Sequence, residues 1–184
     1  MIPLPMIMYA TWAIFVVAGL QDLWRLRISN ILPVTLIALF PLWVWRTGFE
    51  NDLWQNAAFF LFSLSAGLLL FSRKWLGGGD VKLFAASSLW FDFHAAPYLL
   101  MAITIGGGVL GLLFIIVRRM LLKNTAELTG WLCLKPKGPI PYGIAIAAGS
   151  ILCGQFYGFN PAPPRDVSAV LAGAHKVRLG SVTP

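Results

Sequence analysis

Long uninterrupted apolar segments constrain this chain more than any other feature. Hydrophobic residues make up 58% of its 184 residues, and charged residues make up only 11%. Inside a bilayer the backbone finds no water, so a spanning segment must be helical or part of a closed barrel. Continuous apolar runs of about 20 residues indicate helices, because that length crosses the hydrocarbon core. We therefore expect an all-α polytopic membrane protein with about six transmembrane helices.

Six apolar runs are candidate spans. The second begins after Ser29 and Asn30, which are plausible N-cap residues, and the fourth begins near Asp80. These two runs are short, and the fourth crosses the bilayer only if the glycines before it lie within the membrane. Residues 1–158 are expected to form one membrane domain, and the Pro-rich residues 159–184 a mobile tail. The runs cover residues 4–21, 31–45, 53–72, 80–91, 97–117 and 139–157.

Basic residues predict the orientation in the membrane. Cytoplasmic loops carry an excess of Lys and Arg, and six spans place ten of the fourteen basic residues on one side. We expect this side to be cytoplasmic, with both termini outside and with anionic lipid as its partner. Nucleic acid is not an expected partner, because no aromatic-basic binding module is visible. The ten residues are Arg25, Arg27, Arg73, Lys74, Lys82, Arg118, Arg119, Lys123, Lys135 and Lys137.

Two of the seven acidic residues lie at the ends of membrane-length runs. Asp22 ends the first run, and Asp80 follows three glycines, Gly77, Gly78 and Gly79. An acidic side chain at the membrane edge is costly to desolvate, which makes it a candidate functional residue. The glycines are expected to form a bent backbone, with positive φ, that lets a peptide approach Asp80. The alternatives are an ordinary interfacial carboxylate for Asp22 and a hinge or helix-ending turn for the glycines.

Both acids fall on the same predicted membrane face, so we expect them to act as a pair. Two carboxylates about 3 Å apart cannot both ionise, and one then holds a proton. The charged partner can take a proton from water while the protonated partner hydrogen-bonds a scissile carbonyl. Because such a pair titrates as a unit, the sequence alone assigns neither Asp22 nor Asp80 as the acid or the base.

Three segments resemble the type IV prepilin peptidase family of GxGD membrane aspartic proteases. Residues 76–86 (LGGGDVKLFAA) resemble the family's GxGD segment, and residues 139–145 (PIPYGIA) resemble the start of its last span. Residues 22–30 (DLWRLRISN) resemble its first-aspartate segment, D-x5-I-P-N, with Ser29 in place of the proline. The resemblance covers about residues 10–155.

The resemblance implies an aspartic endopeptidase of the bacterial inner membrane. Such enzymes cleave the short basic leader of prepilins or pseudopilins on the cytoplasmic side, and the catalytic pair corresponds to Asp22 and Asp80. Larger members carry a soluble insertion with paired CxxC motifs and also N-methylate the new terminus. This chain has neither motif, so it resembles the short form that serves Flp/Tad pili, and methyltransferase activity is not expected.

Other residues and functions complete the set of hypotheses. Lys82 lies two residues past Asp80, where it contacts the substrate, balances the charge of the pair, or simply extends to the interface. No cofactor or metal is expected, because the two histidines and two cysteines form no ligand cluster. The alternative functions are a small proton-coupled transporter, although no internal repeat is visible, and a non-catalytic assembly factor.

Overall fold

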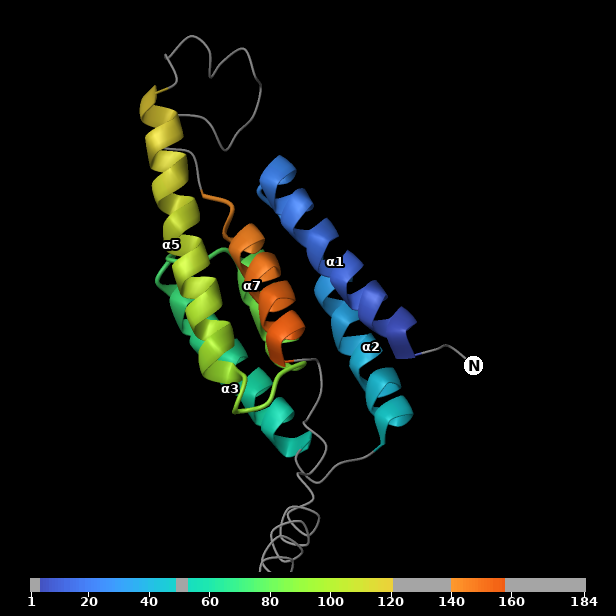
Figure 1. The fold of residues 1–184 in the computed structure, drawn as a ribbon. Coiled ribbons are helices and arrows are strands. Elements are labelled where there is room, and N and C mark those ends of the chain that lie inside the picture. Colours follow the sequence, from blue (N-terminus) through green and yellow to red (C-terminus); the bar gives the residue numbers. More distant parts are fainter. Residues whose placement is uncertain (1–3, 49–52, 121–139, 158–184) are drawn as a thin grey trace, which may run out of the picture.

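The computed structural model describes residues 4–48, 53–120 and 140–157, and these residues form six helices. Successive helices alternate in direction along the bundle (Figure 1). Within the described ranges every regular element is a helix, which confirms the predicted all-α class. The helices are α1 (Leu4–Arg25), α2 (Ile31–Thr47), α3 (Leu53–Ser72), α4 (Gly78–Ser88), α5 (Ala96–Met120) and α7 (Tyr142–Tyr157).

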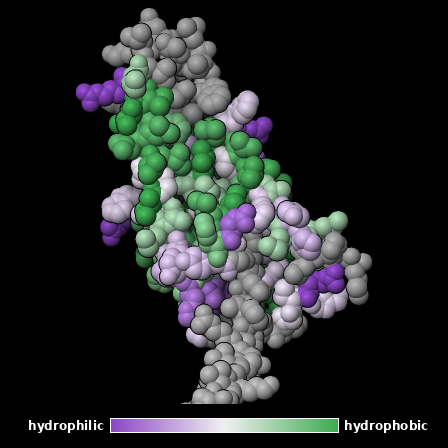
Figure 2. Space-filling view, viewed as in Figure 1, coloured by the Kyte–Doolittle hydropathy of each residue, from purple (hydrophilic) through white to green (hydrophobic). Residues whose placement is uncertain are grey.

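Three of these helices, α1, α3 and α5, are long and apolar enough to cross a membrane. The apolar helices α2 and α7 are shorter. Helix α5 is the most apolar of the three long ones and the least covered by the rest of the bundle. Its exposed face is built from large side chains such as Ile105, Val109 and Leu112. Figure 2 shows a broad hydrophobic surface over the bundle, with hydrophilic residues mainly at its edges. Such a surface is typical of contact with lipid.

Helix α4 is the most buried helix of the bundle. It has only 11 residues, so it is about 16 Å long and does not cross a bilayer by itself. It packs against α2, α3 and α7. Its buried residues are mostly small, which permits this close approach; they include Ala85, Ala86, Ser87 and Ser88. The number of complete membrane crossings therefore stays a prediction.

Contacts between α3 and α4 fix the depth of the α4 N-terminus. Asn56, near the start of α3, donates a hydrogen bond to the carbonyl of Leu89 at 3.0 Å. A Cβ at Gly67 would lie 2.7 Å from Val81 Cγ1, so Gly67 and Val81 lie at the same height along the bundle. Gly67 lies five residues before the end of α3, which is a distance of about 7 Å along the helix. The first turn of α4 is therefore recessed below the end of its neighbour.

Every predicted helix boundary lies within four residues of the boundary in the structure. Helix α1 continues to Arg25, four residues beyond the predicted limit, and α4 begins two residues before Asp80. Asn30 occupies the N-cap position of α2, as predicted, but its side chain makes no capping hydrogen bond. The amide oxygen of Asn30 instead accepts a hydrogen bond from Lys82 Nζ at 2.9 Å. The predicted tail, residues 159–184, lies outside the described residues.

Candidate active site

Asp22 is positioned by the last turn of α1. The helix ends just beyond it, where Leu26 adopts a left-handed backbone with φ 52° and donates its N–H to the Asp22 carbonyl at 2.8 Å. Gln21 Oε1 accepts the backbone N–H of Ser29 at 2.7 Å, which ties the following connection back to α1. The side chain of Asp22 is 5% exposed and points into the bundle. Asp22 is thus a buried carboxylate, which excludes the ordinary interfacial carboxylate considered from the sequence.

Asp80 lies in the first turn of α4, outside the three long candidate spans. Gly77 occupies the N-cap position of α4, and its backbone N–H donates a hydrogen bond to the Asp80 carboxylate. Asp80 is the third helical residue, and its side chain accepts this hydrogen bond as in a capping box. The other oxygen, Oδ1, is buried and has no hydrogen-bond partner among the described residues. Burial raises the pKa of Asp80 to about 7; the Asp22 charge contributes to this increase, and the Gly77 hydrogen bond opposes it.

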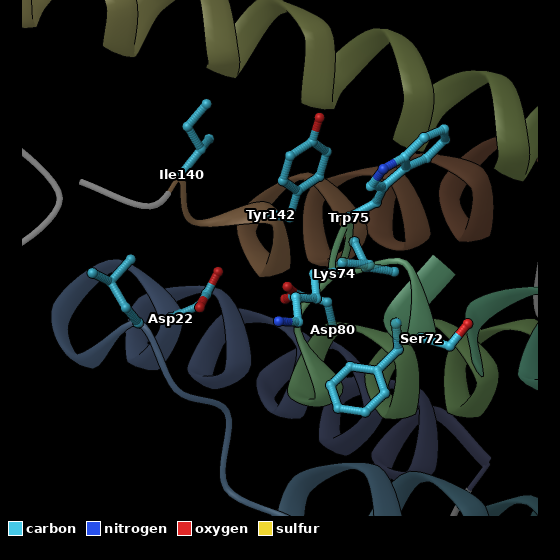
Figure 3. A pocket seen from close by; sticks show the side chains of 11 residues that line it. Asp22, Ser72, Lys74, Trp75, Asp80, Ile140 and Tyr142 are labelled. Atoms are coloured by element: carbon cyan, nitrogen blue, oxygen red, sulfur yellow. The ribbon is translucent and has the colours of Figure 1, made fainter. Parts of the chain in front are cut away.

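One open pocket of about 770 Å³ contains both carboxylates. It lies where the last turn of α1 meets the first turns of α4 and α7, at one end of the bundle. Figure 3 shows Asp22 and Asp80 in this pocket beside Lys74 and Tyr142. A second cavity of about 260 Å³ also contains both acids, and its other residues come from the glycine segment and the α1–α2 connection. The structure thus brings together the two acids that the sequence paired.

The glycine segment shapes this pocket by close contact, and the predicted positive φ is wrong. Gly77 has φ −72°, and among the described glycines only Gly48 has a positive φ. A Cβ at Gly79 would lie 3.2 Å from Ile28 Cβ and 3.3 Å from its backbone nitrogen. A Cβ at Gly77 would lie 2.8 Å from Asp80 Oδ2. The segment therefore lacks side chains because the α1–α2 connection and the carboxylate occupy that space.

A hydrogen bond between distant segments fixes the other carboxylate. Gly143, in the first turn of α7, donates its N–H to Asp22 Oδ2 at 2.7 Å. A Cβ at this position would lie 2.8 Å from the same oxygen. The sequence placed Gly143 only in the segment resembling the start of the family's last span. The position of Gly143 in the sequence does not predict a contact with Asp22.

Lys82 lies beside Asn30, and it is absent from the residues that line the two pockets containing the acids. Its hydrogen bond connects α4 to the start of α2. The lysine that lines the larger pocket is instead Lys74, which sequence analysis considered only as part of the basic face.

Lys74 and Trp75 form the turn that ends α3. Lys74 has φ 59°. Its N–H bonds the Phe71 carbonyl at 2.9 Å, and the Trp75 N–H bonds the Leu70 carbonyl at 3.0 Å. This is the Schellman pattern, in which glycine usually occupies the left-handed position. Both residues line the pocket, and Trp75 is 73% exposed. A lysine at such a position gives no turn signal in the sequence, which explains why the lining was missed.

The arrangement supports acid–base chemistry on water. A pair of interacting carboxylates, one favouring its protonated form near neutral pH, can remove a proton from water and donate one to a carbonyl. Within the described part of the chain, no three His, Cys, Asp or Glu residues lie together as potential ligands of a metal ion.

Comparison with known proteins gives one match. The sequence profile of the type IV leader peptidase family matches residues 8–116, more than half of the chain, and this range includes both Asp22 and Asp80. No curated protein and no solved structure matches the chain significantly. The family acts on prepilin-type leader peptides, and the long apolar helices agree with a membrane-embedded hydrolase. The chain therefore belongs to the type IV leader peptidase family.

Proposed function

We propose that this protein is an aspartic endopeptidase that removes the basic leader of a prepilin or pseudopilin at the cytoplasmic face of a bacterial inner membrane. Asp22 and Asp80 are the catalytic pair, and the protein crosses the membrane several times. The observation that carries the proposal is that both carboxylates line one open pocket at the end of an apolar bundle. The absence of paired CxxC motifs from these 184 residues favours a peptidase of the Flp/Tad pilus type.

The recessed position of Asp80 suits a substrate that is half in water and half in lipid. A prepilin carries its scissile bond between a basic leader and an apolar helix. The pocket opens at the end of the bundle where the basic helix ends gather, and its Asp80 side lies about one turn below the end of α3. A segment that enters from the water can therefore reach the acids without leaving the membrane edge.

The lining of the pocket supports binding of a peptide with apolar side chains. Both acids are surrounded mainly by large hydrophobic residues, which can cover the residues next to the scissile bond and exclude water. These are Leu26, Phe71, Trp75, Leu76, Ile140 and Tyr142.

Charge distribution limits how the leader is recognised. Lys74 lines the pocket, and a basic leader is repelled by it and by the basic face around it. The carboxylates are then the attractive groups inside the pocket, while anionic lipid is the natural partner of the surrounding cations. Gly77 and Gly79 let the Asp80 carboxylate and the α1–α2 connection pack closely against this segment. Lys82 lies outside the pocket and connects α4 to the start of α2 through Asn30.

Cleavage of a synthetic substrate tests the proposal. The purified protein in detergent is incubated with a peptide that joins a short Lys- and Arg-rich leader to an apolar helix, and products are identified by mass spectrometry. We expect a single cut near the junction, and we expect Asp22→Asn or Asp80→Asn to lower the cleavage rate by several orders of magnitude at equal folded concentration. Cleavage by either variant at the wild-type rate would remove that acid from the mechanism. No product from the wild type would overturn the peptidase proposal itself.

A further inference from the structure

The two carboxylates of the pocket have different surroundings. Asp22 Oδ2 accepts the backbone N–H of Gly143 at 2.7 Å. The N–H groups in the first turn of a helix have no partner within that helix, and the N-terminal end carries a partial positive charge. Gly143 lies in this first turn of α7, so both the hydrogen bond and the helix end favour a negative charge on Asp22.

Asp80 also lies in the first turn of a helix, α4, which favours a negative charge, but one of its two oxygens has no compensating partner. Its Oδ1 is buried and accepts no hydrogen bond within the described ranges, and an ionised oxygen in that position leaves its charge uncompensated. The Gly77 N–H reaches the same carboxylate. The charged groups that line the pockets around Asp80 are Asp22, Lys74 and Arg27. Of the two acids, Asp80 is therefore the one whose surroundings better suit a neutral carboxyl group.

We infer that Gly143 is a positioning residue that holds Asp22 in its ionised form, so that the proton shared by the pair resides on Asp80 in the resting enzyme. This inference rests on the proposed peptidase function and assigns the two roles that the sequence left open. Asp22 is the base, and Asp80 is the acid.

The assignment defines a balanced reaction. Asp22 takes a proton from water while the water oxygen bonds to the scissile carbon, and Asp80 gives its proton to the carbonyl oxygen. The resulting diol then collapses: the C–N bond breaks, the leaving nitrogen takes the proton from Asp22, and one diol hydroxyl returns a proton to Asp80. One water is consumed, and both acids regain their starting forms.

Two glycines of α7 provide a matched pair of variants. An alanine Cβ at position 143 would lie 2.8 Å from Asp22 Oδ2 and 2.8 Å from Ile28 Cδ1. An alanine Cβ at position 149 would lie 2.8 Å from Ile103 Cγ1, on the side facing α5. Both substitutions strain the same helix by a similar close contact, but only Gly143→Ala displaces the carboxylate.

The test compares kcat and KM against pH for the wild type, Gly143→Ala and Gly149→Ala, with thermal midpoints measured in parallel. For Gly143→Ala we expect kcat to fall about 100-fold, as for a misplaced catalytic group, with little change in KM. We also expect the acidic limb of its profile to move to higher pH. Gly149→Ala should lower the midpoint and keep the wild-type limb. An unshifted limb in Gly143→Ala, or the same shift in Gly149→Ala, would overturn the positioning role.

A second comparison holds even if Gly143→Ala does not fold. The amide of Asp80→Asn can still donate a hydrogen bond to the scissile carbonyl, whereas nothing in Asp22→Asn replaces the base. The residual rate of Asp80→Asn should therefore exceed that of Asp22→Asn, although both lie far below the wild type. Equal rates or the reverse order would overturn the assignment, whereas an inactive wild type would instead overturn the proposed function.

Discussion

At the scale of single residues, the pocket depends on Asp80, a buried acid whose protonated form the surroundings favour. The carboxyl group lies in a helix N-terminal turn, which favours a negative charge, but burial and the neighbouring Asp22 outweigh this effect and raise its pKa to about 7. The proposed pair thus contains one acid that favours its protonated form below about pH 7, which suits two carboxylates that share one proton.

The raised pKa of Asp80 predicts how activity and stability depend on pH. If the protonated form is the acid, the cleavage rate should fall as the pH rises through about 7. Stability should change in the same direction. The pKa of Asp80 in the folded protein lies above the ordinary value of 3.8, so protonated Asp80 stabilises the fold at low pH, and this stabilisation is lost as the pH rises toward 7.

Thermal midpoints in detergent between pH 4 and pH 8 measure this effect. Asp80→Asn should flatten the dependence, because Asn does not titrate. A midpoint for the wild type that rises steadily over this range would contradict a neutral Asp80.

The pH–rate profile should also be unaffected by EDTA, and a loss of activity that zinc restores would exclude the aspartic mechanism.

The glycine segment gives a second prediction at the residue scale. Gly79→Val should reduce the cleavage rate at least about tenfold, since its side chain meets both the Cβ and the backbone nitrogen of Ile28. Gly78→Ala should be tolerated, because its Cβ meets only the movable ring of Phe71 at 3.3 Å. Rates per folded molecule check this contrast. Similar rates in the two variants would show that contact with Ile28 does not shape the site.

At the scale of elements, the turn between α3 and α4 is strained beside the pocket. Lys74 occupies a left-handed position with φ 59°, which costs a residue with a Cβ roughly 1 kcal/mol relative to glycine. A strained residue at a pocket is consistent with retention for function at the expense of stability.

Lys74→Gly tests that interpretation. The substitution should raise the thermal midpoint, because glycine adopts the left-handed position without strain. It should also strengthen binding of a basic leader by removing a like charge from the pocket lining. KM for peptides with leaders of increasing charge provides the measurement, with Arg73→Gly as the control one residue earlier. A lowered midpoint in Lys74→Gly would show that its side chain stabilises the turn.

The structure also indicates which elements the sequence could predict. Apolar length alone locates α3 at residues 53–72 without error, because lipid-facing helices are defined by composition. The start of α4 was placed too late, since glycine has low helix propensity, and residues 78 and 79 are helical where they pack against Phe71 and Ile28. The pairing of Asp22 and Asp80 was foreseen, whereas the contact with Gly143 was not, because no local pattern encodes a hydrogen bond across 121 residues.

At the scale of the whole molecule, the open question is how far α4 extends across the bilayer. Its C-terminal end lies beside the start of α3, since Asn56 donates a hydrogen bond to the carbonyl of its C-cap residue, Leu89, at 3.0 Å. Its N-terminal end is recessed below the end of α3. We predict that this short helix covers part of the membrane thickness and that the segment before it, with Gly77, completes the crossing.

This geometry predicts the outcome of cysteine labelling in intact cells. In a background without Cys133 and Cys153, single cysteines are introduced at Arg27, in the α1–α2 connection, and at Phe93, which is 45% exposed between α4 and α5. A membrane-impermeant thiol reagent should label position 93 in intact cells and position 27 only after permeabilisation. Position 51, between α2 and α3, should behave like position 93, and so should position 174 near the C-terminus. If position 51 is labelled from outside while position 93 is protected, α4 returns to the side on which it began. The acids would then face a re-entrant segment.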